Sequence, residues 1–326
     1  MSIQETKFKA IADAIRAKTG ETGTIVANDF ATKIAAIPTG VAKPSWVQTT
    51  LPASANWTSV CYGDGKFVAV TGGTSTAAYS TDGINWTQVT LPASEYWISV
   101  CYGDGKFVAV ADGSIAAYST DGINWTQTAF PAHRHWSSVC YGNGKFVTVA
   151  VNSNAAAYSN DGINWTQTTL PISIQWNSVC YGNGKFVAIT ANSNIAAYST
   201  DGINWTQTTL PASAYWISVC YGDGKFVAVA NGSIAAYSND GINWTQTTSP
   251  VSAYWYSVCY GNGKFVAIAT DSNVAAYSND GINWTQTTLP TRARWNSVCY
   301  GNGKFVTVAV NSTISAYLKD YFDEWA

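Results

Sequence analysis

Charged residues are scarce in this sequence. Asp, Glu, Lys and Arg account for 11% of its 326 residues, and the formal net charge is only −2. A protein that binds nucleic acid neutralises the phosphates with a dense patch of Lys and Arg. The composition therefore excludes a nucleic-acid-binding protein of that kind.

Long apolar runs are absent as well. No stretch of the sequence approaches the roughly 20 apolar residues that a membrane-spanning helix requires. The N-terminus is polar and amphipathic, without the apolar centre of a signal peptide. We therefore expect no signal peptide and no membrane insertion, with synthesis and folding in a reducing cytoplasm.

Residues suited to metal binding are few and poorly placed. The only histidines are His133 and His135, and no carboxylate stands beside them in the sequence. The cysteines lack the close spacing that is typical of a zinc site. We expect neither a metal nor any other cofactor.

The seven cysteines mark an internal repeat, because successive positions differ by 39 or 40 residues. A fixed period of about 40 residues with four short β-patterns is typical of a β-propeller blade. The shared register predicts one buried core thiol per repeat, too far from its neighbours for a disulfide. These residues are Cys61, Cys101, Cys140, Cys180, Cys220, Cys259 and Cys299.

Each repeat contains four β-rich runs, which are clearest in residues 97–125. WISVCYG and KFVAVA are joined by an Asp-Gly pair at 104–105, and such pairs favour a tight hairpin turn. IAAYS then leads through a second Asp-Gly pair at 121–122 into NWTQT. We expect four antiparallel strands, named A to D, in every repeat.

The two ends of the repeat array complement each other. Residues 46–52 (WVQTTLP) match a strand D, whereas residues 295–317 supply strands A, B and C without a normal strand D. The N-terminal strand can complete the last blade and remove exposed sheet edges. The predicted fold is all-β: a seven-bladed β-propeller of four-stranded antiparallel blades over residues 41–326, closed by the N-terminal strand D.

The turn between strands C and D carries a motif. Residues 119–125 read STDGINW, and six copies of this segment occur. It resembles the Asp-box of sialidase-like (BNR) propellers, S-x-D-x-G-x-x-W, although it is one residue shorter between Asp and Gly. In that family the box is a structural turn whose Trp packs inside the blade, so the resemblance implies architecture rather than chemistry.

Residues 1–40 do not belong to the repeats. Phe8, Ile11 and Ile15 form one helical stripe and residues 30–37 contain another, which predicts a small helical segment. The segment IADAIRAKTGETGTIVANDFATKIAAIP resembles N-terminal segments of tail and other structural proteins of bacteriophages and prophages. The resemblance implies a virion location and a segment that docks on other phage tail proteins or joins copies in a homo-oligomer.

The repeats differ from one another chiefly in the residues that flank the strand A Trp and in the B–C loop. Both positions emerge on one face of an antiparallel blade, where loops on a rigid scaffold usually bind ligands. Their Tyr, Asn and Ser are typical of adaptable recognition surfaces, although unconstrained drift would also produce such variation. The predicted ligand-binding residues are Asn56, Thr58, Tyr96, Ile98, His135, Ser137, Gln175, Asn177, Tyr215, Ile217, Tyr254, Tyr256, Arg294 and Asn296.

A Trp begins strand A in every repeat. Packing between blades is the favoured interpretation of these residues, and a platform on which sugars stack is the alternative. They are therefore kept as candidates for ligand binding: Trp57, Trp97, Trp136, Trp176, Trp216, Trp255 and Trp295.

The inventory of catalytic residues is poor. The Asp-box resemblance suggests a sialidase, but a sialidase-like site needs a cluster of Arg, a Tyr–Glu pair and an acidic general acid. The chain has four Arg, and Glu95 is the only Glu within the repeats. We therefore expect no catalytic residues and no enzymatic activity.

The function expected from the sequence is non-enzymatic recognition by a phage or prophage tail-associated propeller. Its variable face would bind a bacterial surface glycan or another receptor in a lectin-like manner, and repeated sites would raise avidity. A structural or protein–protein interaction module of the same particle is the alternative. A glycoside hydrolase is a third hypothesis, although it needs two carboxylates at a defined separation.

Overall fold

The computed structural model describes residues 12, 13 and 16 and residues 45–319. Residues Met1–Lys43 and Pro44–Ala326 are two separate compact units. Residues 12, 13 and 16 are helical, and the remainder of the predicted N-terminal helical segment lies outside the described residues. Among the described residues, no helix has the length and apolarity needed to cross a membrane.

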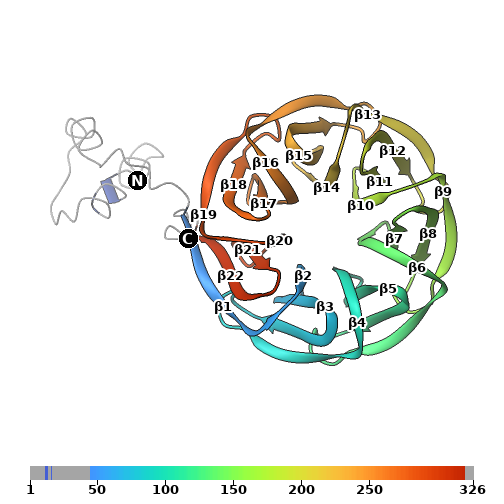
Figure 1. Ribbon diagram of the computed structural model, residues 1–326, viewed down its shortest axis with the longest axis horizontal. Helices are drawn as coiled ribbons and strands as arrows, with labels where there is room; N and C mark the ends of the chain where they lie inside the picture. The colour runs from blue at the N-terminus through green and yellow to red at the C-terminus, as the bar shows by residue number, and fades with distance from the viewer. Residues whose placement is uncertain (1–11, 14–15, 17–44, 320–326) are drawn as a thin grey trace, which may run out of the picture. The chain divides into compact units, whose positions relative to one another are not determined.

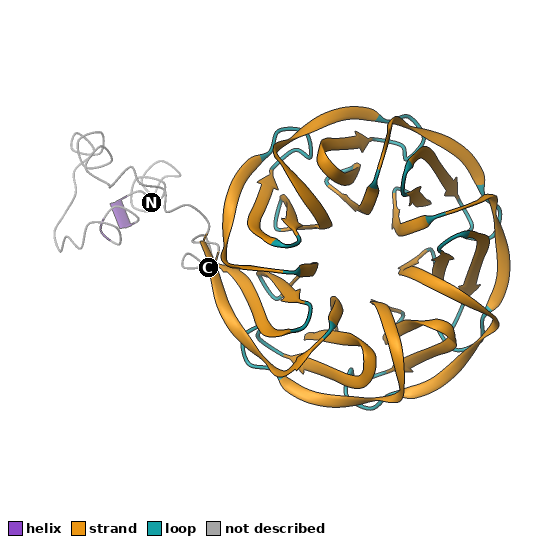
Figure 2. Ribbon diagram, viewed as in Figure 1, coloured by secondary structure: helices purple, strands orange, loops and turns teal. Residues whose placement is uncertain are grey.

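The second unit consists of β-strands joined by short turns (Figure 2). The strands are β1 (Ser45–Ala55), β2 (Trp57–Gly63), β3 (Lys66–Ser80), β4 (Thr87–Gly103), β5 (Lys106–Ser119), β6 (Thr126–Gly142), β7 (Lys145–Ala150), β8 (Ser153–Ser159), β9 (Thr166–Ile174), β10 (Trp176–Gly182), β11 (Lys185–Thr190), β12 (Ser193–Ser199), β13 (Thr206–Ala214), β14 (Trp216–Gly222), β15 (Lys225–Ser238), β16 (Thr245–Gly261), β17 (Lys264–Ala269), β18 (Ser272–Ser278), β19 (Thr285–Ala293), β20 (Trp295–Gly301), β21 (Lys304–Ala309) and β22 (Ser312–Lys319). All of the strand pairs are antiparallel, and they form an all-β propeller.

The strands are arranged as a ring around a central opening (Figure 1). Strands β10, β14 and β20 lie beside the opening, and β1, β9 and β13 lie at the rim. The predicted four-strand unit appears as β10-β11-β12-β13, but larger sheets of six and eight strands also occur. They arise because β4, β6 and β16 run without interruption from strand D of one repeat into strand A of the next.

The N-terminal strand closes the ring, as the two incomplete ends predicted. Strand β1 pairs with β22 in the sheet order β1-β22-β21-β20, with Trp46 opposite Leu318. The first and last repeats are also in contact at the opening, where the backbone N–H of Val60 donates to Ser297 Oγ at 3.1 Å. Neither strand of the closing pair is therefore left with an unpaired inner edge.

The apolar core lies between neighbouring repeats. One cluster combines Val68 and Val70 of the first repeat with Trp97 and Phe107 of the second. Both aromatic side chains have 0% exposure. Because each core is shared by two repeats, no single repeat can bury its own apolar surface, and the array is stable only when the repeats stack.

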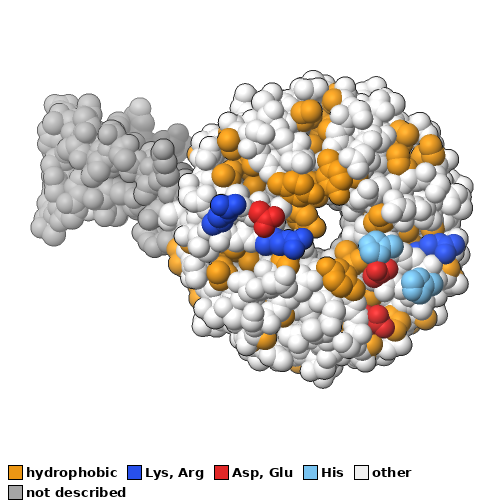
Figure 3. All heavy atoms as spheres, viewed as in Figure 1, with side chains coloured by type: hydrophobic (Ala, Val, Ile, Leu, Met, Phe, Trp, Pro, Cys, Tyr) orange, Lys and Arg blue, Asp and Glu red, His pale blue; other side chains and the backbone are white. Residues whose placement is uncertain are grey.

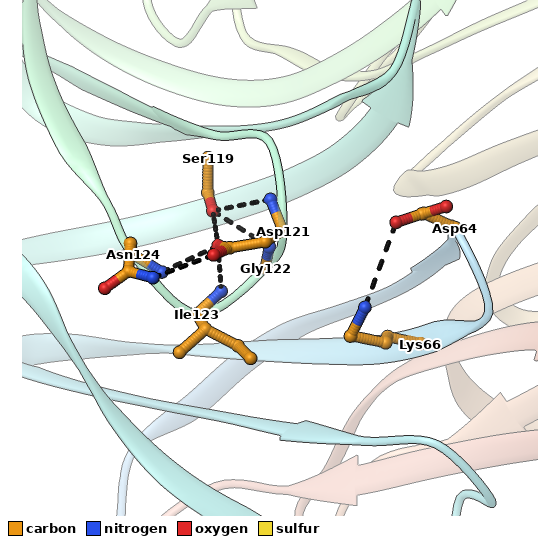
Figure 4. Close-up of polar contacts among 7 residues, drawn as sticks. All are labelled: Asp64, Lys66, Ser119, Asp121, Gly122, Ile123 and Asn124. Carbon is orange, nitrogen blue, oxygen red and sulfur yellow. Dashed lines mark hydrogen bonds and ion pairs between the residues drawn. The ribbon is translucent and has the colours of Figure 1, made fainter.

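The turn between strands C and D is held by one carboxylate (Figure 4). Asp121 Oδ1 accepts hydrogen bonds from the backbone N–H groups of Ile123 and Asn124, both at 2.8 Å. Ser119 Oγ donates to the same oxygen at 2.9 Å and accepts from the N–H of Gly122 at 2.8 Å. The same pattern recurs in other repeats, for example around Asp201.

Gly122 is required in this turn for two reasons. Its φ of 72° lies in the left-handed region, and a Cβ on it would lie 2.8 Å from Val68 Cγ2 of the preceding repeat. The turn therefore serves the packing between repeats as well as the chain reversal.

We expect Asp121→Ala to lower the free energy of unfolding by about 1 kcal/mol, because several hydrogen bonds lose their charged acceptor. Burial by itself raises the pKa of Asp121, but the hydrogen bonds from Asn124, Ile123 and Ser119 outweigh it and hold the pKa well below its usual range. The carboxylate thus contributes stability above about pH 4, and this contribution is lost as the pH falls. Urea unfolding from pH 7 to pH 3 should show the difference between the two proteins shrinking.

The matched control is Asp64→Asn, because Asp64 makes a surface ion pair with Lys66 at 3.8 Å (Figure 4), and Asn occupies the equivalent left-handed position at Asn143, where φ is 46°. Such exposed pairs contribute little, so this variant should unfold like the parent protein. Equal effects of the two substitutions would contradict the assigned role of the turn.

The cysteines are free thiols; Cys61 is buried as predicted, whereas the other six side chains are partly buried. Burial raises the pKa of the Cys101 thiol, and burial likewise raises that of Cys220. Thiolate is the reactive form, so the native protein holds very little of it near neutral pH.

We expect the folded protein to resist thiol reagents. At pH 8, a disulfide reagent such as dithionitrobenzoate should label far less than one thiol per native chain within minutes. In guanidinium chloride all seven should react, and mass spectrometry counts the adducts. Rapid labelling of the native chain would contradict the raised pKa of these thiols.

Candidate functional site

A pocket of about 800 Å³ occupies the centre of one end of the propeller. Figure 3 shows an opening at the centre of the ring, on a face with few charged side chains. The structure brings all fourteen of the predicted variable residues into the lining of this one pocket: Asn56, Thr58, Tyr96, Ile98, His135, Ser137, Gln175, Asn177, Tyr215, Ile217, Tyr254, Tyr256, Arg294 and Asn296.

These residues meet because every repeat enters strand A at the same end of the ring. The residue before the strand A Trp and the residue after it, such as Tyr254 and Tyr256 around Trp255, both line the pocket. The B–C loops contribute further residues, among them Thr270 and Asp271. The residues that flank the strand A Trp and residues of the B–C loops thus lie on one face of the propeller, as predicted.

The strand A Trp residues do not line this pocket. Each is 0–1% exposed, and each indole packs in a core, as Trp97 does among Val100, Phe107 and Ala109. A sugar cannot stack on a ring that has no exposed surface. The alternative that these seven residues form a stacking platform is therefore corrected in favour of packing.

A ring of serines forms the inner part of the pocket, and the sequence analysis missed it. Each serine stands two residues after the strand A Trp, and its Oγ accepts a hydrogen bond of 3.1–3.2 Å from a Val backbone N–H of the next repeat. The constant W-x-S pattern is the signal of this ring in the sequence, because it places a Ser at the same point of strand A in every repeat. The serines are Ser59, Ser99, Ser138, Ser178, Ser218, Ser257 and Ser297.

We expect Ser218→Ala to lower the free energy of unfolding by about 1 kcal/mol, because the N–H of Val258 loses its acceptor. Urea unfolding measures the change. Ser94→Ala is the control, since Ser94 is exposed and its Oγ lies 3.5 Å from the Gly73 carbonyl oxygen. A loss of the same size in both variants would contradict a role for the serine ring in joining the repeats.

Three tyrosines form an aromatic cluster on one side of the pocket. The ring centroids of Tyr215 and Tyr254 are 6.1 Å apart, and those of Tyr254 and Tyr256 are 6.1 Å apart with an interplanar angle of 28°. Burial and the neighbouring Tyr215 raise the pKa of Tyr254 to about 12, while the positive charge of Arg294 acts in the opposite direction. The phenol of Tyr254 is therefore a neutral hydrogen-bonding group near pH 7.

Amide and hydroxyl side chains connect neighbouring repeats around the pocket. Asn56 Nδ2 donates to Tyr96 Oη at 3.1 Å, and Gln175 Nε2 lies 3.4 Å from Tyr215 Oη. Asn177 Nδ2 donates to the backbone carbonyl of Trp216 at 2.8 Å. These bonds fix the orientation of the lining groups before any ligand arrives.

Charged groups are few and lie apart. His135 Nδ1 is 2.7 Å from Asp112 Oδ2, whereas Arg294 and Asp271 line another part of the pocket. Within the described ranges, no group of three or more His, Cys, Asp or Glu could hold a metal ion. The lining can therefore form hydrogen bonds, stack on a ring and offer one guanidinium.

Several solved structures resemble the propeller. Virginiamycin B lyase from Staphylococcus aureus is 12% identical over 85% of this chain and 100% of the other, with a TM-score of 0.76. YCF48 from Cyanidioschyzon merolae is 14% identical over 84% and 98% of the two chains, with a TM-score of 0.67. The Pan2 WD40 domain from Neurospora crassa is 7% identical over 84% and 95%, with a TM-score of 0.64. At these identities the likeness concerns the fold.

One of these likenesses corrects the prediction that the chain is not an enzyme. The streptogramin B and virginiamycin B lyases are enzymes, and their structures share this fold at 12% identity. The chain lacks the catalytic residues of a sialidase, and this argues against sialidase activity only. The absence of catalysis therefore does not follow from this architecture.

The family comparison covers most of the propeller. A search of curated proteins found no match to the sequence. The model of the DUF6242 beta propeller domain matches residues 45–135 and 172–294, which together make up more than half of the chain. The chain therefore belongs to the DUF6242 beta propeller family.

Proposed function

We propose that the central pocket is a ligand-binding site and that its ligand is a saccharide of a bacterial surface. The observation that carries the proposal is the placement of the variable residues. The repeats are nearly identical in their strands and turns, yet the residues that flank the strand A Trp differ between repeats and line one pocket of about 800 Å³. A cavity of this size, with fixed polar groups, is typical of sites for small ligands.

The chemistry of the lining favours a saccharide. Tyr rings offer flat apolar surface, and Asn, Gln, Ser and Thr side chains offer donors and acceptors for hydroxyl groups. Tyr96 is 47% exposed, and its hydroxyl accepts a hydrogen bond from Asn56. A mostly uncharged lining suits a ligand rich in hydroxyl groups.

We further propose that the protein acts at the tail of a phage or prophage particle. This proposal rests on the resemblance of residues 1–40 to tail proteins, and it gives that segment contacts with other tail proteins or with further copies of the chain. We also propose that the C–D turn is an Asp-box and that the propeller has seven blades. The seven A–B strand pairs, one in each repeat, support that count.

The test is an array of bacterial surface glycans probed with the full chain. We expect binding to at least one glycan class, and about tenfold weaker binding for Tyr254→Ala and for Tyr256→Ala, because each removes a stacking surface. Isothermal titration with the strongest glycan then measures the dissociation constant.

Ile172→Ala is the matched control, since Ile172 is 38% exposed and does not line the pocket. It should bind like the parent protein. No glycan binding by a folded chain would reject the proposal and favour a structural role in the particle. Glycan binding that is unchanged by both tyrosine substitutions would indicate that the glycan binds outside this pocket.

A further inference from the structure

Arg294 is the lining residue that the proposed function leaves unexplained. It directly precedes the fully buried Trp295, and its side chain is exposed to the pocket. Its backbone carbonyl accepts the N–H of Val310 at 2.9 Å, which fixes its place at the entrance of strand β20. Arg is rare in this chain, which has four. We therefore interpret the guanidinium of Arg294 in the pocket as a group that binds a partner.

The repeat itself shows what Arg294 lacks. His135 holds the equivalent position, five residues before the cysteine of its own repeat, and its Nδ1 is paired with Asp112 at 2.7 Å. The B–C loop that precedes Arg294 is one residue longer than the loop that carries Asp112, and it places Thr270 and Asp271 at this point. Among the described residues, no carboxylate forms an ion pair with Arg294 as Asp112 does with His135.

The carboxylate of this loop belongs to Asp271. Asp271 is the only carboxylate among the described residues that line the pocket, and no ion pair joins it to Arg294 in the described part of the chain. The backbone carbonyl of Asp271 instead accepts a hydrogen bond from Arg292 Nε at 2.9 Å, outside the pocket. A planar guanidinium in a concave site can hold a carboxylate or a phosphate through two parallel hydrogen bonds.

We propose that the ligand of the pocket is an acidic saccharide whose anionic group is bound by Arg294 while its ring lies against Tyr254 and Tyr256. Asn296, two residues further along β20, also lines the pocket and is part of this sector. The inference rests on the proposed saccharide function, and it specifies the class of sugar. The geometry gives one charged contact within a largely uncharged lining, so the anion is selected without a broad basic surface.

The experiment compares sugars that carry an anionic group with matched sugars in which that group is esterified or absent. Isothermal titration of the full chain uses trigalacturonate and its methyl ester, and then galactose 6-phosphate and galactose. We expect the charged member of at least one pair to bind about tenfold more tightly, with a dissociation constant that rises with sodium chloride. A preference within the first pair assigns a carboxylate, and a preference within the second assigns a phosphate.

Two variants separate the role of Arg294 from general effects of charge. Arg294→Gln should reduce the binding of the acidic sugar about tenfold and leave that of its neutral counterpart unchanged. Arg134→Gln removes the same charge in another repeat, outside the pocket, and should change neither. Thermal unfolding confirms that both variants are folded.

The outcomes distinguish this inference from the function on which it rests. Equal affinity for both members of each pair would overturn the anionic preference and leave saccharide binding in place. A preference that persists in Arg294→Gln would likewise overturn the role of Arg294. Binding of none of these sugars, together with an empty glycan array, would reject the saccharide function and the inference with it.

Discussion

The antiparallel pairing of β1 with β22 is the constraint on which the rest of the structure depends. It joins the two ends of the repeat array, so that the N-terminal strand and the last repeat share a sheet. It also brings Tyr62 onto Gly301, where a Cβ would lie 1.9 Å from Tyr62 Cγ. Because the pocket takes residues from every repeat, it exists only when the ring is closed.

The repeats divide their residues between two tasks. The C–D turn, the glycines and the buried Trp build contacts between neighbouring repeats, and every copy must satisfy the same geometry. The entrance of strand A has fewer constraints, since a side chain there needs only to leave the backbone pairing intact. Thr58, Ser137 and Asn177 each bond to a carbonyl of the next repeat and still line the pocket. The residues that differ between repeats are therefore concentrated at positions where a substitution changes the chemistry of the pocket without disturbing the fold.

The pocket is asymmetric although the scaffold is nearly symmetric. The aromatic cluster around Tyr254 occupies one sector with Arg294, and the pair of His135 with Asp112 occupies another. Propellers of the same shape include lyases and a WD40 domain. Since the shared fold provides only the position of the site, the activity must come from these few side chains.

The sequence by itself determined the strand order, the closure and the identity of the variable residues. A period of about 40 residues and incomplete ends leave few other arrangements, because exposed sheet edges are unfavourable. The tertiary structure decided which residues reach the pocket. The burial of Trp97 and its equivalents, and the serine ring headed by Ser59, depend on how adjacent repeats pack against each other. The surroundings of Arg294 also became visible only there, because Tyr254 and Arg294 belong to different repeats and line the same pocket.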